Sequence, residues 1–276
     1  HTAIRPVCLC HTMIDGRSTT VEWQRHTGRI AVWGIGACEQ HGPRLPLDTD
    51  SLLAETFARG LAQSLDAALL PTLGIGTSLE HTGFRGTISL RPETLMQVVR
   101  EVAEAVAEQG FTRLVLVNGH GGNHSLLPVA RDINRRDGRL KIVLAAVADF
   151  ADREAWHAIA PDGAELHAGA FETSLLLALD PSRVRDSGTA CAPAAGTYTP
   201  IVPRDLTMFG VGAHVADGVA GNPRYASREV GERLVASIHA NLLAFVRECL
   251  CRFDRQPRYC AGGGLTLRPL TTNDVP

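Results

Sequence analysis

An apolar run over residues 30–35 leads directly into a loop that carries three carboxylates and an imidazole, and this feature constrains the fold most. The run is short and bounded by glycine, which predicts a buried strand. Glu39 and His41 follow it closely, and Asp48 and Asp50 come a few residues later. Glycine and proline between them exclude regular structure, so these groups lie in a shaped loop at the carboxyl end of a strand. Ligands bind at that edge in α/β proteins, and carboxylates and imidazoles coordinate divalent metals, so we expect a metal site here.

Further apolar runs predict strands at residues 67–73, 113–117 and 141–147. Helical periodicity predicts helices that begin at 49 or 50, run from 92 to 110, follow residue 124 to about 136, and span 227 to about 251. This alternation is typical of an α/β fold in which helices sandwich a mostly parallel sheet. We expect one domain over residues 21–250, an N-terminal arm over 1–20 and a C-terminal tail over 251–276. The proline- and glycine-rich segment 191–222 is interpreted as an ordered loop over a site.

Composition excludes several classes of function. The net charge of −2 and the 5% aromatic content give no support for nucleic-acid binding. No apolar run reaches eighteen residues and no signal-peptide pattern begins the chain, so we expect a cytoplasmic protein with no membrane partner. The seven cysteines are interpreted as buried or idle thiols. Lys141 is the single lysine, which leaves Schiff-base and P-loop chemistry without an obvious residue.

Three glycine-rich loops each carry a histidine, and parallel strands would bring these loops to one edge of the sheet. Together they supply five candidate metal ligands: Glu39, His41, Asp50, His120 and Glu172. Five exceed the need of one tetrahedral zinc and suit two ions that share a bridging carboxylate, for which Asp50 is our choice. His167 remains as the general acid or base. Such a site makes hydroxide near neutral pH and polarises a carbonyl, which predicts hydrolysis of an amide or related C–N bond.

Each of these signals also has a simpler interpretation. Asp50 could be a helix N-cap, and Glu172 could only favour a helix dipole. The loop around His120 could be an ordinary turn or a phosphate cradle, and Cys38 could be a nucleophile. Further groups are expected to contact substrate or support the ligands, with an ordinary loop role as the alternative: Glu80, His81, Asn118, Gly121, Gly122, Asn123 and His124.

The motifs at 39–50 (EQHGPRLPLDTD), 118–123 (NGHGGN) and 167–174 (HAGAFETS) resemble the creatininase (creatinine amidohydrolase) family over about residues 20–250. The resemblance implies a three-layer α/β/α sandwich, hydrolysis of cyclic or linear amides, and a homo-oligomer, commonly a hexamer built as a trimer of dimers. It implies a dinuclear centre, zinc first, with manganese or iron as alternatives. Glu39, Asp50 and His120 would hold one ion, and His41, Asp50 and Glu172 the other, with His167 as acid or base and a small-molecule or peptide amide as substrate.

The chain departs from that family pattern at four positions. Creatininase proper has a tyrosine and a glutamate where this chain has Gly121 and Gly122, which argues against creatinine itself as substrate. Arg44 stands where a second histidine is common, and Ala170 where many relatives carry glutamate. Arg44 and Ala170 motivate a non-catalytic metal-binding subunit as an alternative. An anion-binding α/β module without metal is a further alternative. Segments 83–87 and 218–223 resemble the mycofactocin-system peptidases of the family, and its formamide hydrolases fit the motifs nearly as well.

Overall fold

The computed structural model describes residues 13–136, 138, 140–161, 165–186 and 203–255. The sheet consists of four parallel strands in the order β2-β1-β3-β4. Their bounds are β1 Ile30–Ile35, β2 Ala68–Leu73, β3 Arg113–Asn118 and β4 Lys141–Ala146. Val32 pairs with Leu69 on one side and with Val115 on the other. Since β1 and β3 are central and covered on both faces, they are apolar at nearly every position, which is why the sequence predicted them well.

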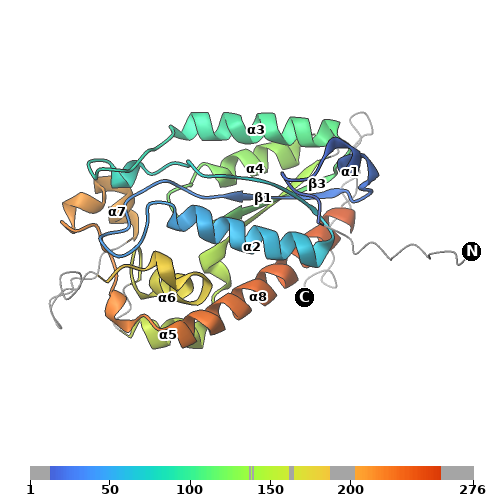
Figure 1. Ribbon diagram of the computed structural model, residues 1–276. Coiled ribbons are helices and arrows are strands. Elements are labelled where there is room, and N and C mark those ends of the chain that lie inside the picture. The colour runs from blue at the N-terminus through green and yellow to red at the C-terminus, as the bar shows by residue number, and fades with distance from the viewer. Residues whose placement is uncertain (1–12, 137, 139, 162–164, 187–202, 256–276) are drawn as a thin grey trace, which may run out of the picture.

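Helices cover both faces of the sheet, so the predicted α/β/α sandwich is confirmed (Figure 1). One face carries α3 Pro92–Glu108 and α4 Leu126–Arg135, whose side chains pack against Trp33 and Leu116. The other face carries α2 Thr49–Leu65, α6 Ala170–Leu179 and α8 Arg228–Arg255, whose side chains pack against Val32 and Val115. Successive strand residues therefore contribute to opposite cores, as the two-residue period of a strand requires.

The remaining described elements are short and lie in the connections: α1 Thr20–Arg25, η1 Leu79–His81, η2 Val147–Phe150, α5 Arg153–Ile159, η3 Pro181–Arg183, α7 Pro203–Phe209, η5 Val211–Ala213 and η6 Pro223–Tyr225. Three of them, α7, η5 and η6, lie in or next to the segment interpreted as a loop, so its described part is more helical than expected. Residues 191–202 of that segment lie outside the described residues, as do residues 1–12 and 256–276.

The structure also describes the segments next to the two expected domain boundaries. The described part of the N-terminal arm lies beside β2, where the Leu69 amide donates to the carbonyl of Ile14 at 2.8 Å. At the other end, α8 continues to Arg255, into the segment expected to be a tail. By length and composition this helix could cross a membrane, but its residues Leu234 and Ile238 are fully buried against the sheet face. Its length and apolar composition are therefore weak evidence for a membrane span.

Two glycines press the amino end of α2 against the carboxyl ends of the central strands. A side-chain carbon on Gly36 would lie 2.5 Å from the Ser51 nitrogen, and one on Gly119 would lie 2.2 Å from the Asp50 carbonyl oxygen. Any larger residue would separate α2 from the sheet edge. The close approach fixes the first turn of α2, with Asp50 in it, between the ends of β1 and β3.

Candidate metal centre and active site

The five candidate ligands lie together at the carboxyl edge of the sheet. Glu39 and His41 follow β1, and Asp50 lies in the first turn of α2. His120 follows β3, and Glu172 lies in the first turn of α6. The Nε2 atom of His41 is 3.4 Å from Asp50 Oδ1 and 3.7 Å from Glu172 Oε2. On the other side of Asp50, His120 Nδ1 is 3.3 Å from Oδ2, and His120 Nε2 is 3.1 Å from Glu39 Oε2.

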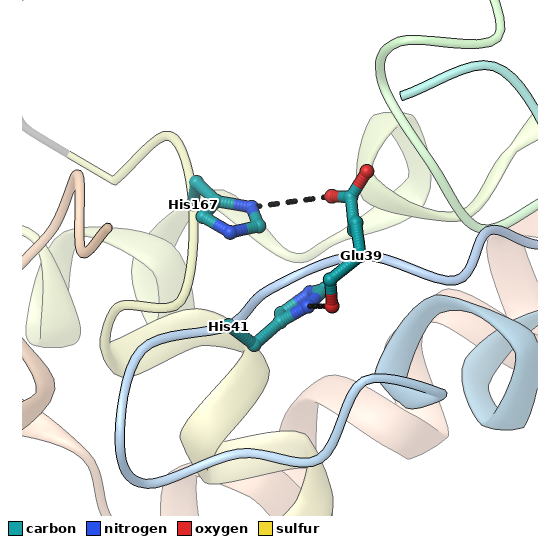
Figure 2. Close-up of side chains that lie close together, drawn as sticks. All are labelled: Glu39, His41 and His167. Atoms are coloured by element: carbon teal, nitrogen blue, oxygen red, sulfur yellow. Dashed lines mark hydrogen bonds and ion pairs between the residues drawn. The ribbon is translucent and has the colours of Figure 1, made fainter. Parts of the chain in front are cut away.

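Ligand atoms of these residues form groups that are compact enough for metal ions. The atoms of each group lie within 4.8 Å of one another, and the groups are Glu39–Asp50–His120, His41–Asp50–Glu172 and Glu39–His41–His167. The first two are the sets that the family resemblance implies, and Asp50 belongs to both. The third was not anticipated, and it makes His167 a possible ligand as well as an acid or base (Figure 2).

Several of the candidate ligand atoms lack a hydrogen-bond partner, which also fits a metal site. Both carboxylate oxygens of Glu39, Nε2 of His41 and Oδ2 of Asp50 are buried without a hydrogen-bond partner in the described part of the chain. Buried polar groups are normally paired, since an unpaired one costs about 1–3 kcal/mol. Divalent cations coordinated by these four atoms would satisfy them.

Asp50 does not serve as the helix N-cap, which was one alternative interpretation. The N-cap position is Asp48, and its side chain makes no capping hydrogen bond. The Asp50 residue is 1% exposed and faces the two imidazoles. Glu172 does accept a hydrogen bond from the Ala168 amide at 2.6 Å, so its position at the start of α6 also satisfies a backbone donor.

The electrostatics of the cluster favour positive charge. Burial raises the pKa of Glu39 to about 8, against the lowering effect of His120. Burial also opposes the charging of His120, but Glu39 and Asp50 overcome it and raise the His120 pKa to about 10. The pKa of His41 is raised well above its ordinary value by Asp50 and Glu172, again against burial. The carboxylates therefore draw protons onto the two imidazoles, as a site built for cations would.

His167 is held in one orientation. Its Nε2 lies 2.7 Å from the carbonyl oxygen of Gln40, so Nε2–H donates there and Nδ1 is left as the acceptor. Nδ1 faces Glu39, with 3.5 Å between Nδ1 and Oε1 (Figure 2). Burial, followed by the charge of His41, lowers the pKa of His167 to about 4. Its imidazole is therefore neutral near pH 7 and able to accept a proton.

The other expected site residues divide into two groups. Glu80, His81, Gly121, Gly122 and His124 line a pocket of about 160 Å³ beside the ligands. Asn118 and Asn123 are outside that lining. They are buried and hold the loops: the Asn118 amide donates to the His120 carbonyl at 2.7 Å, and Asn123 Oδ1 accepts from the Thr77 amide at 2.9 Å. Cys38 is also outside the lining, with its sulfur 3.6 Å from the Gly86 carbonyl oxygen.

Two residues whose hydrogen bonds hold the loops beside the ligands were not predicted from the sequence. The Gln40 amide nitrogen lies 2.9 Å from His81 Nδ1 and donates to the Gly218 carbonyl at 3.0 Å, so this side chain joins two loops beside the ligands. Glu165 is buried, and its two oxygens accept from the amides of Phe171 and Asn222. Gln40 stands between two expected ligands and Glu165 stands two residues before His167, so adjacency in sequence was the available signal.

Part of the pocket lining comes from the segment that was interpreted as a loop over the site. Leu206 and Thr207 of α7 and Val211 of η5 line the pocket, together with Leu166. The described part of segment 191–222 therefore does border the site. The cavity is therefore lined by polar and charged groups of the ligand loops and by the apolar residues Leu166, Leu206 and Val211.

The fold and this site define an α/β/α protein with a carboxylate- and histidine-rich centre able to hold divalent cations. The creatininase model, described as creatinine amidohydrolase, matches residues 17–246. This chain therefore belongs to the creatininase family.

Individual relatives and solved structures agree with this assignment. The chain is 33% identical over 231 residues to the mycofactocin precursor peptide peptidase of Mycolicibacterium smegmatis, covering 81% of this chain and 87% of the relative. It is 30% identical over 248 residues to the creatinine amidohydrolase of Pseudomonas putida, covering 82% and 94%. A mutant creatininase of the Zn-Zn type superposes with a TM-score of 0.69 at 26% identity, covering 86% and 98%. A manganese creatininase gives 0.68 at 25% identity with the same coverage.

Proposed function

We propose that this protein is a metal-dependent amidohydrolase that cleaves the C–N bond of an amide in a small or peptidic substrate. The observation that carries the proposal is the convergence of five acidic and imidazole side chains, of which all but the partly buried Glu172 are buried. Four atoms of this set have no hydrogen-bond partner among the described residues. Membership of the creatininase family supports the same reaction class.

The residues fit two ions that share Asp50. Glu39 and His120 would complete one site, and His41 and Glu172 the other. Zinc is our first choice, with manganese or iron as alternatives, because this ligand set accepts all three. The Zn-Zn and manganese forms of solved creatininases support that choice. When bound, such ions supply Lewis acidity, which lowers the pKa of water and polarises a carbonyl.

The chain's own residues supply proton transfer and shape. His167 Nδ1 is the acceptor that faces the site, so it would take a proton from the attacking water and return it to the leaving nitrogen. The Gln40 carbonyl holds the opposite ring nitrogen and so keeps Nδ1 aimed at the reacting atoms. Leu166, Leu206 and Val211 would exclude bulk water from the bound amide.

A precursor-peptide peptidase is the second candidate for the specific activity. The 33% identity to the mycobacterial enzyme favours it. The pocket of about 160 Å³ beside the ligands would take the residue next to the cleaved bond. A homo-oligomer is part of the same proposal and is supported by the family resemblance; a cytoplasmic location is proposed with it.

Metal content in matched variants tests the ligand assignment. We expect about two ions per chain in the wild type, about one in His120→Ala and in Glu172→Gln, and close to none in Asp50→Ala, because Asp50 serves both sites. His124→Ala is the matched control, since His124 lines the pocket but belongs to no metal-capable group in the described chain. Elemental analysis after gel filtration gives the count. Full metal content in Asp50→Ala would refute the assignment.

Hydrolysis of an amide panel then separates an enzyme from a non-catalytic metal-binding subunit. The panel should include creatinine, N-formyl compounds and short peptides, with metal-loaded protein. Turnover of any member that falls at least a hundredfold in His167→Ala, with metal content retained, supports the proposal. Metal binding without turnover of any member favours the non-catalytic alternative, and metal content near zero in the wild type favours the anion-binding one.

A further inference from the structure

Two backbone groups fix the orientation of the buried side-chain amide of Gln40. Its Oε1 accepts a hydrogen bond from the Gly42 amide at 2.9 Å, and its Nε2 donates to the Gly218 carbonyl at 3.0 Å. A reversed amide would place oxygen against oxygen and NH₂ against N–H, so the NH₂ group points to Gly218. Gly218 has a φ of +81°, and a side-chain carbon on it would lie 1.9 Å from Gln40 Oε1. Glycine at 218 is therefore what lets the amide occupy this position.

This amide determines which ring nitrogen of His81 carries the hydrogen. Gln40 Nε2 lies 2.9 Å from His81 Nδ1 and 3.1 Å from His167 Nε2. The His167 nitrogen donates its own hydrogen to the Gln40 carbonyl, so it is not an acceptor. The second hydrogen of the NH₂ group therefore goes to His81 Nδ1, which must offer a lone pair. The ring of His81 is then neutral, with its hydrogen on Nε2.

This Nε2–H group of His81 faces a candidate metal ligand. Nε2 lies 3.2 Å from Oε1 of Glu39, and both side chains are buried. His120 Nε2 is 3.1 Å from Glu39 Oε2 but nearer, at 2.9 Å, to the Thr77 carbonyl, so its hydrogen goes to Thr77. The buried Ser78 hydroxyl is also close to Glu39, without an aligned hydrogen bond. Glu39 Oε1 has no aligned hydrogen bond in the described chain either, so a turn of the carboxylate toward His81 would complete one.

A neutral donor suits this position beside a metal ligand. A charged imidazole would cancel the negative charge that Glu39 offers to a cation, whereas a neutral N–H orients the carboxylate and leaves that charge in place. A carboxylate oxygen has two lone pairs, so Oε1 can accept this hydrogen and still bind an ion. Groups that hydrogen-bond to metal ligands fix the orientation of the ligands and raise metal affinity.

We propose that His81, kept in its Nε2–H form by the Gln40 amide, is a positioning residue that donates a hydrogen bond to Glu39 and holds this carboxylate for the metal. The inference rests on the function proposed above, because it needs Glu39 to bind an ion. It accounts for a histidine that lines the pocket but belongs to none of the metal-capable groups of the described residues.

The hydrogen position on His81 can be measured directly in the zinc-loaded protein. Long-range ¹H–¹⁵N correlation spectra of histidine-labelled protein distinguish a ring nitrogen that carries a hydrogen from one that does not. The signals that disappear in His81→Gln are those of His81. We expect its Nε2 to carry the hydrogen and its Nδ1 to carry none. In Gln40→Glu a carboxylate oxygen would face Nδ1, so we expect that nitrogen to gain a hydrogen.

Zinc affinity in matched variants tests the hydrogen bond to Glu39. Loss of a group that orients a metal ligand typically costs about 10–100-fold in metal affinity, so we expect at least about tenfold weaker zinc binding in His81→Leu, measured by competition with a chelator. His81→Gln should keep most of the wild-type affinity, because an amide, like a neutral imidazole, both accepts and donates. His157→Leu is the matched control, since it removes an exposed imidazole of α5 that belongs to no metal-capable group in the described chain.

The outcomes separate this inference from the proposed function. Weaker zinc binding in His81→Leu, its rescue in His81→Gln and a hydrogen on Nε2 in the wild type support the inference. A hydrogen on Nδ1 in the wild type overturns it, and so does unchanged zinc affinity in His81→Leu. An equal loss in His81→Leu and His81→Gln also overturns it, because the ring itself would then be a ligand or a packing element. A wild type that binds no zinc, manganese or iron overturns the proposed function itself.

Discussion

Replacement of Glu165 should destabilise the segment that carries His167 and Glu172, by an amount that follows from two hydrogen bonds. Oε2 accepts from the Phe171 amide at 3.1 Å, and Oε1 accepts from the Asn222 amide at 3.0 Å. Glutamine at 165 keeps one acceptor oxygen and turns an NH₂ group toward the other amide. A buried donor without a partner costs about 1–3 kcal/mol, so we expect Glu165→Gln to lose about 2 kcal/mol and Glu165→Ala about twice as much.

Denaturant unfolding and melting temperature measure this loss. For a chain of this size, about 2 kcal/mol corresponds to a fall in Tm of roughly 4–8 °C. The control is Glu154→Gln, which removes the same charge from a side chain that is 87% exposed and should change stability by less than about 0.5 kcal/mol. If Glu165→Gln were as stable as the wild type, the amides of Phe171 and Asn222 would have other partners. The proposed stabilisation of this segment by Glu165 would then be wrong.

Three further predictions concern stability. Gly231→Ala should cost about 1–3 kcal/mol in urea unfolding, because its methyl group would lie 1.9 Å from the Ser174 carbonyl oxygen and force α8 away from α6; an unchanged midpoint would contradict that packing. Hydrogen bonds from Arg17 lower the pKa of Asp15 to about 2, below the ordinary 3.8. The ionised Asp15 therefore stabilises the folded state above about pH 4, and this stabilisation disappears as the pH falls toward 2. The wild type should therefore exceed Asp15→Asn by about 1 kcal/mol at pH 7 and by progressively less in melts from pH 5 to 3; a constant difference would refute this. Chelation with EDTA should lower Tm, and added zinc should restore it. Zinc at a thousand times its dissociation constant should raise the free energy of unfolding by about 4 kcal/mol, and a Tm that neither treatment changes would count against a metal site.

The sequence predicted the fold well because its strongest signals are local. Each strand is a continuous apolar run, and each of the three motifs follows a strand or begins a helix, so parallel pairing alone brings them to one edge. The helix α7 was missed because it has only seven residues and lies between proline and glycine. Its contribution to the pocket depends on packing against η1, which no local pattern encodes.

The position of individual side chains could be predicted only in part. Ligands predicted from the motifs, such as Asp50 and His120, do lie within contact distance of each other. The placement of Glu80 above Gly122 was not predictable, because it depends on how the η1 loop folds back over a different loop. Gln40 was overlooked for a similar reason: its role comes from the distance to His81, which lies 41 residues away in the chain.

The close packing of α2 against the strand ends limits how the substrate specificity of such a protein could change. Gly36 and Gly119 leave no room to shift Asp50, so the floor of the pocket resists change even by a single methyl group. The other lining residues, from η1, α7 and η5, lie in connections rather than in the sheet. We therefore expect new substrates to be accommodated by changes in those connections, while the position of Asp50 stays fixed.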